Sequence, residues 1–340
     1  VLTWGFNSTN FGNMLFRAMP LIMTGLSVAV AFKTGLFNIG APGQYLMGTL
    51  VSLSVALGIP SESVPVGIIW LLAFLGGMLA GALWGAIPGL LKALLNINEV
   101  LACIMTNWIA ANLVTWMFDI SSFKNVTEGT KSGYIYKTTF NGVATPKLGL
   151  DQLFPGSQVN AGILVAIILA IVVYIIMEKT VFGYELKAVG LNKSAARYAG
   201  INEKKNIILS MAIAGALAGF GAGLYYLSNV SQWNPLNSTS LPTMGFNGIS
   251  VALLASSNPI GTVFSALFIS HISVGGSFLS TKFYPTEISD LISGIIIYLC
   301  AFSMLFRGKI QSLLFRNAEK TNVNAEPAAP AKSATEKEGK

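Results

Sequence analysis

The feature that most constrains this chain is a series of long apolar runs that contain no charged residue. Residues 161–177, for example, include no Asp, Glu, Lys or Arg, whereas residues 178–205 include many. Charged residues make up 10% of the chain, against about 25% in soluble domains. Hydrophobic residues make up 53% of it, which is more than one or two soluble cores can bury. Continuous runs of this kind are typical of bilayer-spanning helices and exclude a membrane β-barrel, whose strands alternate apolar and polar residues.

We therefore predict an all-α, polytopic transmembrane helical bundle with about eight or nine membrane segments. One run, 246–255, is shorter than the ~20 residues that cross a bilayer, so we expect a broken or half-length helix there. The predicted segments are 18–32, 36–57, 64–91, 100–118, 161–177, 207–227, 246–255, 262–278 and 287–306.

Lys and Arg residues predict the side of the membrane that each loop occupies, because they concentrate in short cytoplasmic loops. They place residues 178–206 in the cytoplasm, together with a tail, 307–340, whose composition predicts that it is largely disordered. Residues 119–160 then form an extracellular loop, and residues 1–17 form an extracellular lead-in to the membrane domain, 18–306. An extracellular N-terminus without a signal peptide is unusual, so we expect one further helix before the first residue of this sequence.

Glycines recur at a spacing of four residues in two of the predicted segments. This spacing puts them on one face of a helix, where the missing side chains let another backbone approach closely. Two interpretations stay open, permanent helix packing and smooth faces that move against each other. The glycines are Gly77, Gly81, Gly85 and Gly89 in one segment, and Gly215, Gly219 and Gly223 in the other.

Two apolar segments are interrupted by polar residues, one at residues 35–44 and the other at residues 244–250. Backbone groups freed by such breaks need partners in hydrocarbon, so broken helices occur where they line a cavity or are buried in protein. Paired interruptions indicate a solute path. The two share only a short pattern, Gly-Leu-Phe-Asn at residues 35–38 and Gly-Phe-Asn at residues 245–247, and chance similarity is the alternative. The candidates for such a path are Asn38, Gln44, Phe246 and Asn247.

A third polar cluster lies within segment 100–118. Asn107 and Asn112 lie deep in this segment, and together with Trp108 they offer hydrogen bonds and a stacking surface to a ring-bearing solute. Hydrogen bonding between neighbouring helices is the alternative. We add Asn107 and Trp108 to the candidate solute path.

No catalytic or metal-binding set emerges from the sequence. The chain has no GxxxxGK[ST] loop and no G-x-S-x-G motif, and its single histidine and two cysteines have no metal-ligand spacing. The scarcity of titratable residues at membrane depth counts against an ion-coupled secondary carrier. We therefore expect a chain that is not an enzyme, binds no cofactor or metal, and receives energy from another subunit.

Three motifs resemble those of permeases of the branched-chain amino acid, simple sugar and nucleoside ABC importer family. The cytoplasmic stretch 180–206 matches A-V-G-x-N-x-x-A-A-x-x-A-G-I, residues 35–48 match G-L-F-N-I-G-x-x-G-Q, and residues 97–110 match I-N-E-V-x-x-x-I-M-x-N-W. The last two forms are most typical of the nucleoside branch, and the similarity covers residues 15–306. In this family the cytoplasmic stretch is the element that couples the permease to its ATPase. The coupling residues implied by the match are Ala188, Gly190, Asn192, Ala195, Ala196 and Gly200.

The resemblance also implies partners and a location. It implies a second homologous permease, cytoplasmic ATP-binding subunits that carry ATP and Mg²⁺, an extracellular lipid-anchored substrate-binding protein, membrane lipid and no nucleic acid. The expected location is the plasma membrane of a bacterium, and the expected activity is nucleoside import by alternating access. Permeases for simple sugars or branched-chain amino acids, and an ion-coupled carrier from another class, remain as alternatives.

Overall fold

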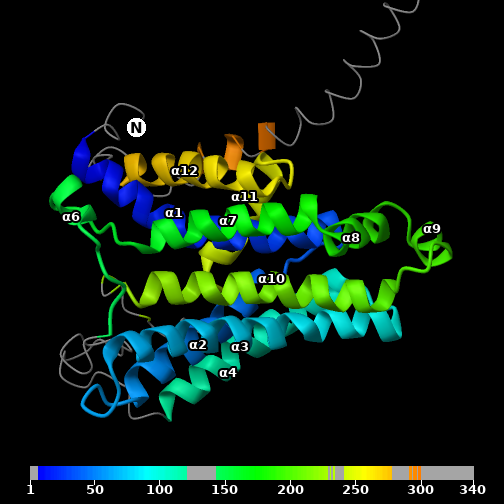
Figure 1. Ribbon diagram of the computed structural model, residues 1–340, viewed down its shortest axis with the longest axis horizontal. Coiled ribbons are helices and arrows are strands. Elements are labelled where there is room, and N and C mark those ends of the chain that lie inside the picture. Colours follow the sequence, from blue (N-terminus) through cyan, green and yellow to red (C-terminus); the bar gives the residue numbers. More distant parts are fainter. Residues whose placement is uncertain are drawn as a thin grey trace, which may run out of the picture. The chain divides into compact units, whose positions relative to one another are not determined.

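The computed structural model describes residues 7–120, 143–228, 230, 233 and 241–277, and seven positions within 291–299. Every helix named below belongs to one unit, Val1–Ile297, which is distinct from a second unit, Tyr298–Lys340. Figure 1 shows the long helices of the first unit running side by side. They are α1 (Ser8–Lys33), α2 (Ala41–Gly58), α3 (Val66–Leu95), α4 (Glu99–Asp119), α6 (Leu150–Leu153), α7 (Gly162–Lys179), α8 (Val181–Leu191), α9 (Lys193–Tyr198), α10 (Glu203–Tyr226), α11 (Thr243–Leu254) and α12 (Pro259–Gly276).

Six of the described helices are long and apolar enough to cross a bilayer, namely α1, α3, α4, α7, α10 and α12. The prediction of a multi-pass, all-helical membrane bundle is therefore confirmed. Helix α2 is as long as α7 but more polar, and α11 has only 12 residues, which matches the short helix expected near 246–255. The expected segment 287–306 lies mostly outside the described residues, and the expected helix before the first residue stays a prediction.

Helix α1 begins ten residues before the predicted segment 18–32, at Ser8. Its first turns are too polar for a hydropathy argument to find, because Asn10 and Asn13 lie there. They are held by residues that precede α7: Asn13 Oδ1 accepts a hydrogen bond from Gln158 N at 3.0 Å, and Thr9 Oγ1 donates to the carbonyl of Pro155 at 2.9 Å. Part of the expected lead-in 1–17 is thus helical.

Side-chain caps start the helices at the end of the bundle that we predict to be cytoplasmic. Each capping side chain accepts hydrogen bonds from backbone N–H groups in the first turn, which have no partner within the helix. Asn98 Oδ1, for example, accepts from Val100 N at 2.9 Å. The caps are Asn98 of α4, Thr180 of α8, Asn192 of α9, Asn202 of α10 and Asn258 of α12.

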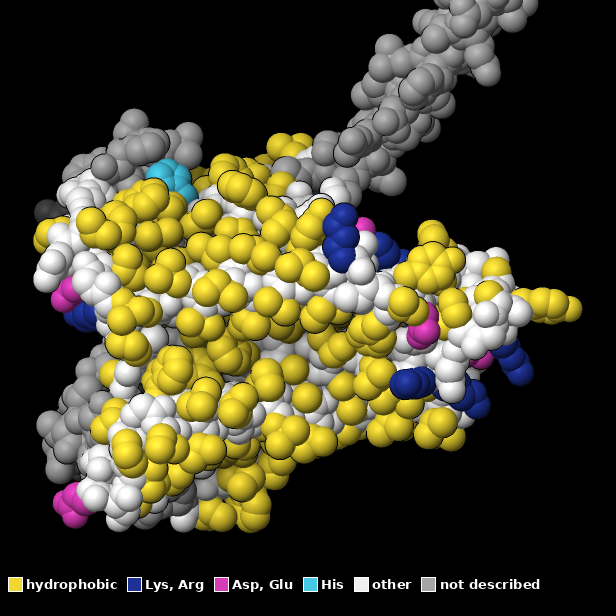
Figure 2. Space-filling view, viewed as in Figure 1, with side chains coloured by type: hydrophobic (Ala, Val, Ile, Leu, Met, Phe, Trp, Pro, Cys, Tyr) yellow, Lys and Arg dark blue, Asp and Glu magenta, His cyan; other side chains and the backbone are white. Residues whose placement is uncertain are grey.

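The basic residues that set the predicted orientation lie together at this end. Lys92, Lys193 and Lys204 line one surface pocket, and Figure 2 shows Lys and Arg side chains gathered around the end that carries α8 and α9. At the other end Thr145, which precedes α7, accepts a hydrogen bond from Trp70 Nε1 at 3.2 Å and donates its N–H to the carbonyl of Leu227 at 2.8 Å. The start of α7 and the helices α8 and α9 thus lie at opposite ends of the bundle (Figure 1), and the side of the membrane that each end faces stays a prediction.

The glycine faces are buried in the contact between α3 and α10. A Cβ atom added to Gly81 would collide with the carbonyl oxygen of Gly215, and one added to Gly215 would collide with that of Gly81. Gly219 meets the backbone of Gly77 in the same way and also that of Gly48 in α2. Close packing of three backbones accounts for the spacing, because no larger side chain fits between them.

Candidate functional site

The first interruption, residues 35–44, comprises the connection between α1 and α2 and the first turn of α2, and its polar side chains bond to one another. Asn38 Nδ2 donates hydrogen bonds to Gln44 Oε1 at 3.0 Å and to Ser27 Oγ at 3.2 Å. Gln44 Nε2 returns a hydrogen bond to Asn38 Oδ1 at 3.1 Å, and Gly40 N donates to the same oxygen at 3.0 Å. Asn38 is 0% exposed and Gln44 is 1% exposed, so this network is closed off from solvent.

Asn107 of α4 supplies the partners that the broken backbone lacks. Its Oδ1 accepts a hydrogen bond from Gly43 N at 2.9 Å, and its Nδ2 donates to the carbonyl of Ile39 at 2.9 Å. The first N–H groups of a helix have no acceptor within that helix, and at membrane depth no water replaces one. The Asn107 carboxamide therefore lets α2 begin inside the bundle.

Three of the six predicted path residues thus come together, namely Asn38, Gln44 and Asn107. Asn38 and Gln44 bond to each other, and Asn107 bonds to the backbone of Ile39 and Gly43. This supports the alternative of interhelical hydrogen bonding for Asn107. Contact of these residues with solute stays a prediction.

The two interruptions predicted from sequence lie against each other. A Cβ atom on Gly245 would stand 2.5 Å from Pro42 N and Cα, and one on Gly248 would stand 2.6 Å from Thr24 Oγ1. The half-length helix α11 is therefore packed on both α1 and the start of α2. The other predicted residues of α11, Phe246 and Asn247, are exposed on the surface of the chain.

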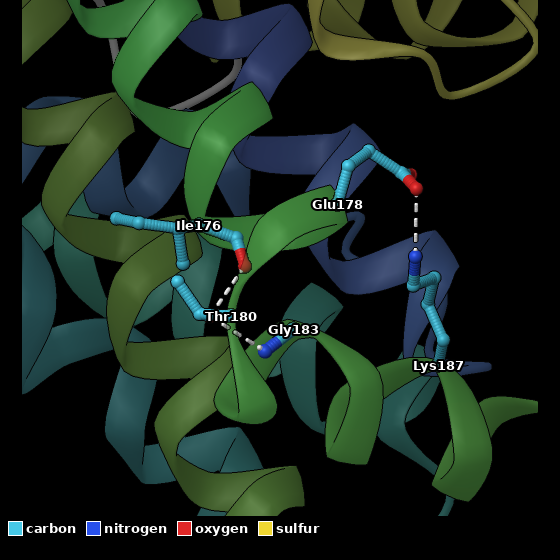
Figure 3. Close-up of polar contacts among 5 residues, drawn as sticks. All are labelled: Ile176, Glu178, Thr180, Gly183 and Lys187. Carbon is cyan, nitrogen blue, oxygen red and sulfur yellow. Dashed lines mark hydrogen bonds and ion pairs between the residues drawn. The ribbon is translucent and has the colours of Figure 1, made fainter.

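The predicted coupling stretch forms two short helices after a sharp bend at the end of α7 (Figure 3). Thr180 Oγ1 donates to the carbonyl of Ile176 at 2.6 Å and accepts from Gly183 N at 3.2 Å. A side chain at Gly183 would collide with the last carbonyls of α7. An ion pair of 2.8 Å between Lys187 Nζ and Glu178 Oε2 closes the bend. These contacts fix the direction in which α8 leaves the bundle.

Gly190 places α8 directly on the α1–α2 connection. A Cβ atom there would collide with the carbonyl oxygen of Lys33 and lie 3.0 Å from the nitrogen of Gly35. Gly35 has φ of +72°, a left-handed conformation that favours glycine, and Gly190 Cα lies close to it. From the other side, Ser210 Oγ of α10 donates to Thr34 Oγ1 at 2.9 Å.

The other predicted coupling residues divide into inward and outward groups. Ala196 is buried and packs with Ala188 against the C-terminal end of α1 and the N-terminal part of α10. Asn192 caps α9 by accepting from Ala195 N at 3.0 Å. Ala195 and Gly200 are exposed, and Gly200 has φ of +82°. The motif therefore mixes residues that hold the two helices in place with residues that face outward.

Two residues that the motif does not include are the most exposed large hydrophobic side chains of the stretch. Leu191 is 89% exposed and Tyr198 is 98% exposed. Tyr198 lines a surface pocket with Ser194 and Arg197. The signal available in the sequence was the presence of two large apolar residues within a stretch of small and charged ones. We call Leu191, Ser194, Arg197 and Tyr198 the α8–α9 tip.

Comparison with known proteins decides the family. The family described as branched-chain amino acid transport system / permease component matches residues 10–301. This chain belongs to that permease family. The nucleoside ABC transporter permease protein NupB of Lactococcus lactis is 38% identical over 311 residues, which cover 88% of this chain and 81% of NupB. The guanosine ABC transporter permease protein NupP of Bacillus subtilis is 34% identical over 297 residues, which cover 87% of this chain and 82% of NupP.

A third relative broadens the range of solutes in the family. The glucose ABC transporter permease protein TsgB13 of Haloferax volcanii is 30% identical over 311 residues, which cover 88% of this chain and 78% of TsgB13. Permease components of ABC transporters are not enzymes, and they work in complexes with ATPase and substrate-binding partners. Among the described residues, no group of three His, Cys, Asp or Glu side chains is placed to hold a metal ion.

Proposed function

We propose that this permease is the translocation subunit of an ATP-driven nucleoside importer in the plasma membrane of a bacterium. The three sequence motifs and the names of NupB and NupP support nucleosides as the solute. The observation that carries the proposal is the α8–α9 stretch, whose exposed tip stands beyond the apolar helices while Gly190 rests on the α1–α2 connection. Such an arrangement suits a membrane subunit that is moved by a separate cytoplasmic motor.

The proposed partners are those that the family resemblance implies. A cytoplasmic ATP-binding subunit, which carries the ATP and Mg²⁺, contacts the α8–α9 tip, and the permease itself binds no cofactor. A second homologous permease completes the membrane path, and a lipid-anchored protein delivers the solute outside. This chain contributes eight or nine membrane segments to the importer, each of about 20 residues where it spans the bilayer fully. Helices α2 and α11 are the broken segments beside the path.

Movement of the α8–α9 tip reaches the membrane through a short series of contacts. Leu191 and Tyr198 receive the force of ATP-driven closure, and α8 transmits it at Gly190 to the backbone of Lys33 and Gly35. The α1–α2 connection then moves together with α8. Helix α11 moves too, because Gly245 and Gly248 pack closely on Pro42 and Thr24, with no space between the backbones. In this proposal the connection keeps its internal hydrogen bonds and moves as one unit between two positions, which would open the path to one side or the other.

A sugar permease is the second candidate, because TsgB13 is 30% identical to this chain. Uptake of labelled solutes by cells with and without the chain separates the two. Loss of nucleoside uptake, with glucose and branched-chain amino acid uptake unchanged, is the expected result. Normal nucleoside uptake in the deleted cells, with glucose uptake lost, would transfer the assignment to sugars.

A further inference from the structure

The outward face of α4 differs from those of α3 and α7. On α3 and α7 the exposed side chains are aliphatic; Leu71, Leu79 and Ile168, for example, are at least half exposed, and such faces suit lipid. The outward face of α4 also carries aliphatic residues but includes Trp108, which is 38% exposed, and Asn112 one turn later. A carboxamide that faces hydrocarbon loses its hydrogen bonds to water, so lipid contact does not explain this face.

The depth of these two residues excludes an interfacial role. At about 1.5 Å per residue, Trp108 and Asn112 lie about 14 and 20 Å along α4 from Glu99, in a hydrocarbon core about 30 Å thick. Tryptophans that anchor a helix lie at the two membrane surfaces instead. Trp108 and Asn112 are therefore a polar and aromatic pair near the middle of the membrane.

The Asn112 side chain is oriented by the helix but keeps hydrogen-bonding capacity. Its Nδ2 donates to the carbonyl of Trp108 at 2.8 Å, which uses one of its two amide hydrogens. The second hydrogen and Oδ1 are left to offer one donor and one acceptor side by side. Asn107, five residues earlier, is 1% exposed and spends both groups on the α1–α2 connection. Asn107 therefore supports the α1–α2 connection, whereas Asn112 has polar groups that remain able to bind another molecule.

We propose that Trp108 and Asn112 form a recognition face for the base of the transported nucleoside. The indole stacks on the base, and the carboxamide forms hydrogen bonds with the base edge, where adjacent donors and acceptors match an amide. This inference rests on the proposed nucleoside import and adds the residues that select the solute. It predicts that the face turns toward the solute path rather than toward lipid.

The test compares transport kinetics of three variants in proteoliposomes that contain the whole importer. Asn112→Leu keeps the approximate size of the side chain and removes its hydrogen bonds, and Asn112→Gln restores the amide. Met105→Leu is the matched control, because Met105 is an exposed apolar residue on the same outward face. We expect Asn112→Leu to raise the KM for nucleosides about tenfold, the effect of one lost hydrogen bond. Asn112→Gln recovers most of the affinity, and Met105→Leu leaves it unchanged.

Two controls distinguish a solute-binding face from a subunit interface and from a lipid-facing surface. Co-purification of the partner subunits is measured for each variant. If Asn112→Leu releases the partners, the face is a subunit interface and the inference is wrong. If the assembled variant transports nucleosides with the wild-type KM, the face does not touch solute and the inference is again wrong. Absence of nucleoside transport by the wild type would instead overturn the proposed function.

Discussion

Two regions of the permease reverse the usual placement of side chains, since one buries polar residues and the other exposes large apolar ones. Around the α1–α2 connection, Asn38, Gln44 of α2 and Asn107 of α4 are buried, and their polar atoms are paired within the protein. The α8–α9 tip leaves Leu191 and Tyr198 almost fully exposed. A buried, fully paired network holds one backbone arrangement, since any broken hydrogen bond leaves an uncompensated polar group. An exposed apolar tip stabilises nothing within the chain and is free to bind a partner.

The largest expected change in stability is at the buried α1–α2 connection. Asn107→Leu removes the acceptor of Gly43 N and the donor to the carbonyl of Ile39, both buried. Two unpaired backbone groups cost about 2–5 kcal/mol together, and we expect the thermal unfolding temperature in detergent to fall accordingly. Asn112→Leu is the control and is expected to change stability by less than about 0.5 kcal/mol, because that residue is exposed. Equal losses from the two variants would contradict the buried role of Asn107.

The junction between the two regions gives the next effect in size. In an isolated helix Gly→Ala stabilises by about 1 kcal/mol, but at Gly190 the added methyl group collides with the carbonyl of Lys33. Overpacking costs about 1–3 kcal/mol, so we expect Gly190→Ala to destabilise the permease and to lower uptake. Thermal unfolding and uptake of labelled nucleoside measure the two effects.

Gly200 offers the matched control for that junction. Nothing lies within 4 Å of a Cβ atom at Gly200, and its φ of +82° suits asparagine better than other residues. Gly200→Asn should therefore unfold close to the wild-type temperature. A stabilised Gly190→Ala variant would show that α8 does not rest on the connection.

The smallest expected effect has the opposite sign. The hydroxyl of Tyr45 in α2 is buried and has no hydrogen-bond partner in the part of the chain that the structure describes. Removing an unpaired buried hydroxyl should relieve a desolvation cost of about 1 kcal/mol. We expect Tyr45→Phe to raise the unfolding temperature slightly, as measured by a thermal scan in detergent. A clear decrease would mean that the hydroxyl is paired in the assembled importer.

Much of the architecture follows from sequence, because a bilayer requires each spanning backbone to bond within itself. That requirement located the six long helices, and the Gly and Pro residues of 35–44 located the break between α1 and α2. The two interruptions also lie together, as their paired occurrence suggested. The early start of α1 at Ser8 was missed, because its partners lie about 145 residues away.

The roles of the polar residues of α4 could not be predicted from the sequence. Asn107 and Asn112 are both polar residues in one apolar helix, five positions and therefore about 140° apart around its axis. Which of them faces a neighbouring helix depends on how α4 packs, and only the structure shows that Asn107 faces Gly43. The motif match likewise named Gly190 as a coupling residue without revealing that it supports α8, and it omitted Tyr198.

The most direct test of the account is ATP-dependent nucleoside uptake by the double variant Leu191→Ala, Tyr198→Ala, in proteoliposomes with its partners. Tyr184→Ala is the control, because Tyr184 is also exposed, at 66%, but lies near the start of α8 rather than at the tip. We predict that the double variant unfolds at the wild-type temperature, releases the ATP-binding subunit on purification and loses at least about tenfold in uptake. Wild-type uptake by the double variant would contradict the assignment of the α8–α9 tip as the site where the motor acts.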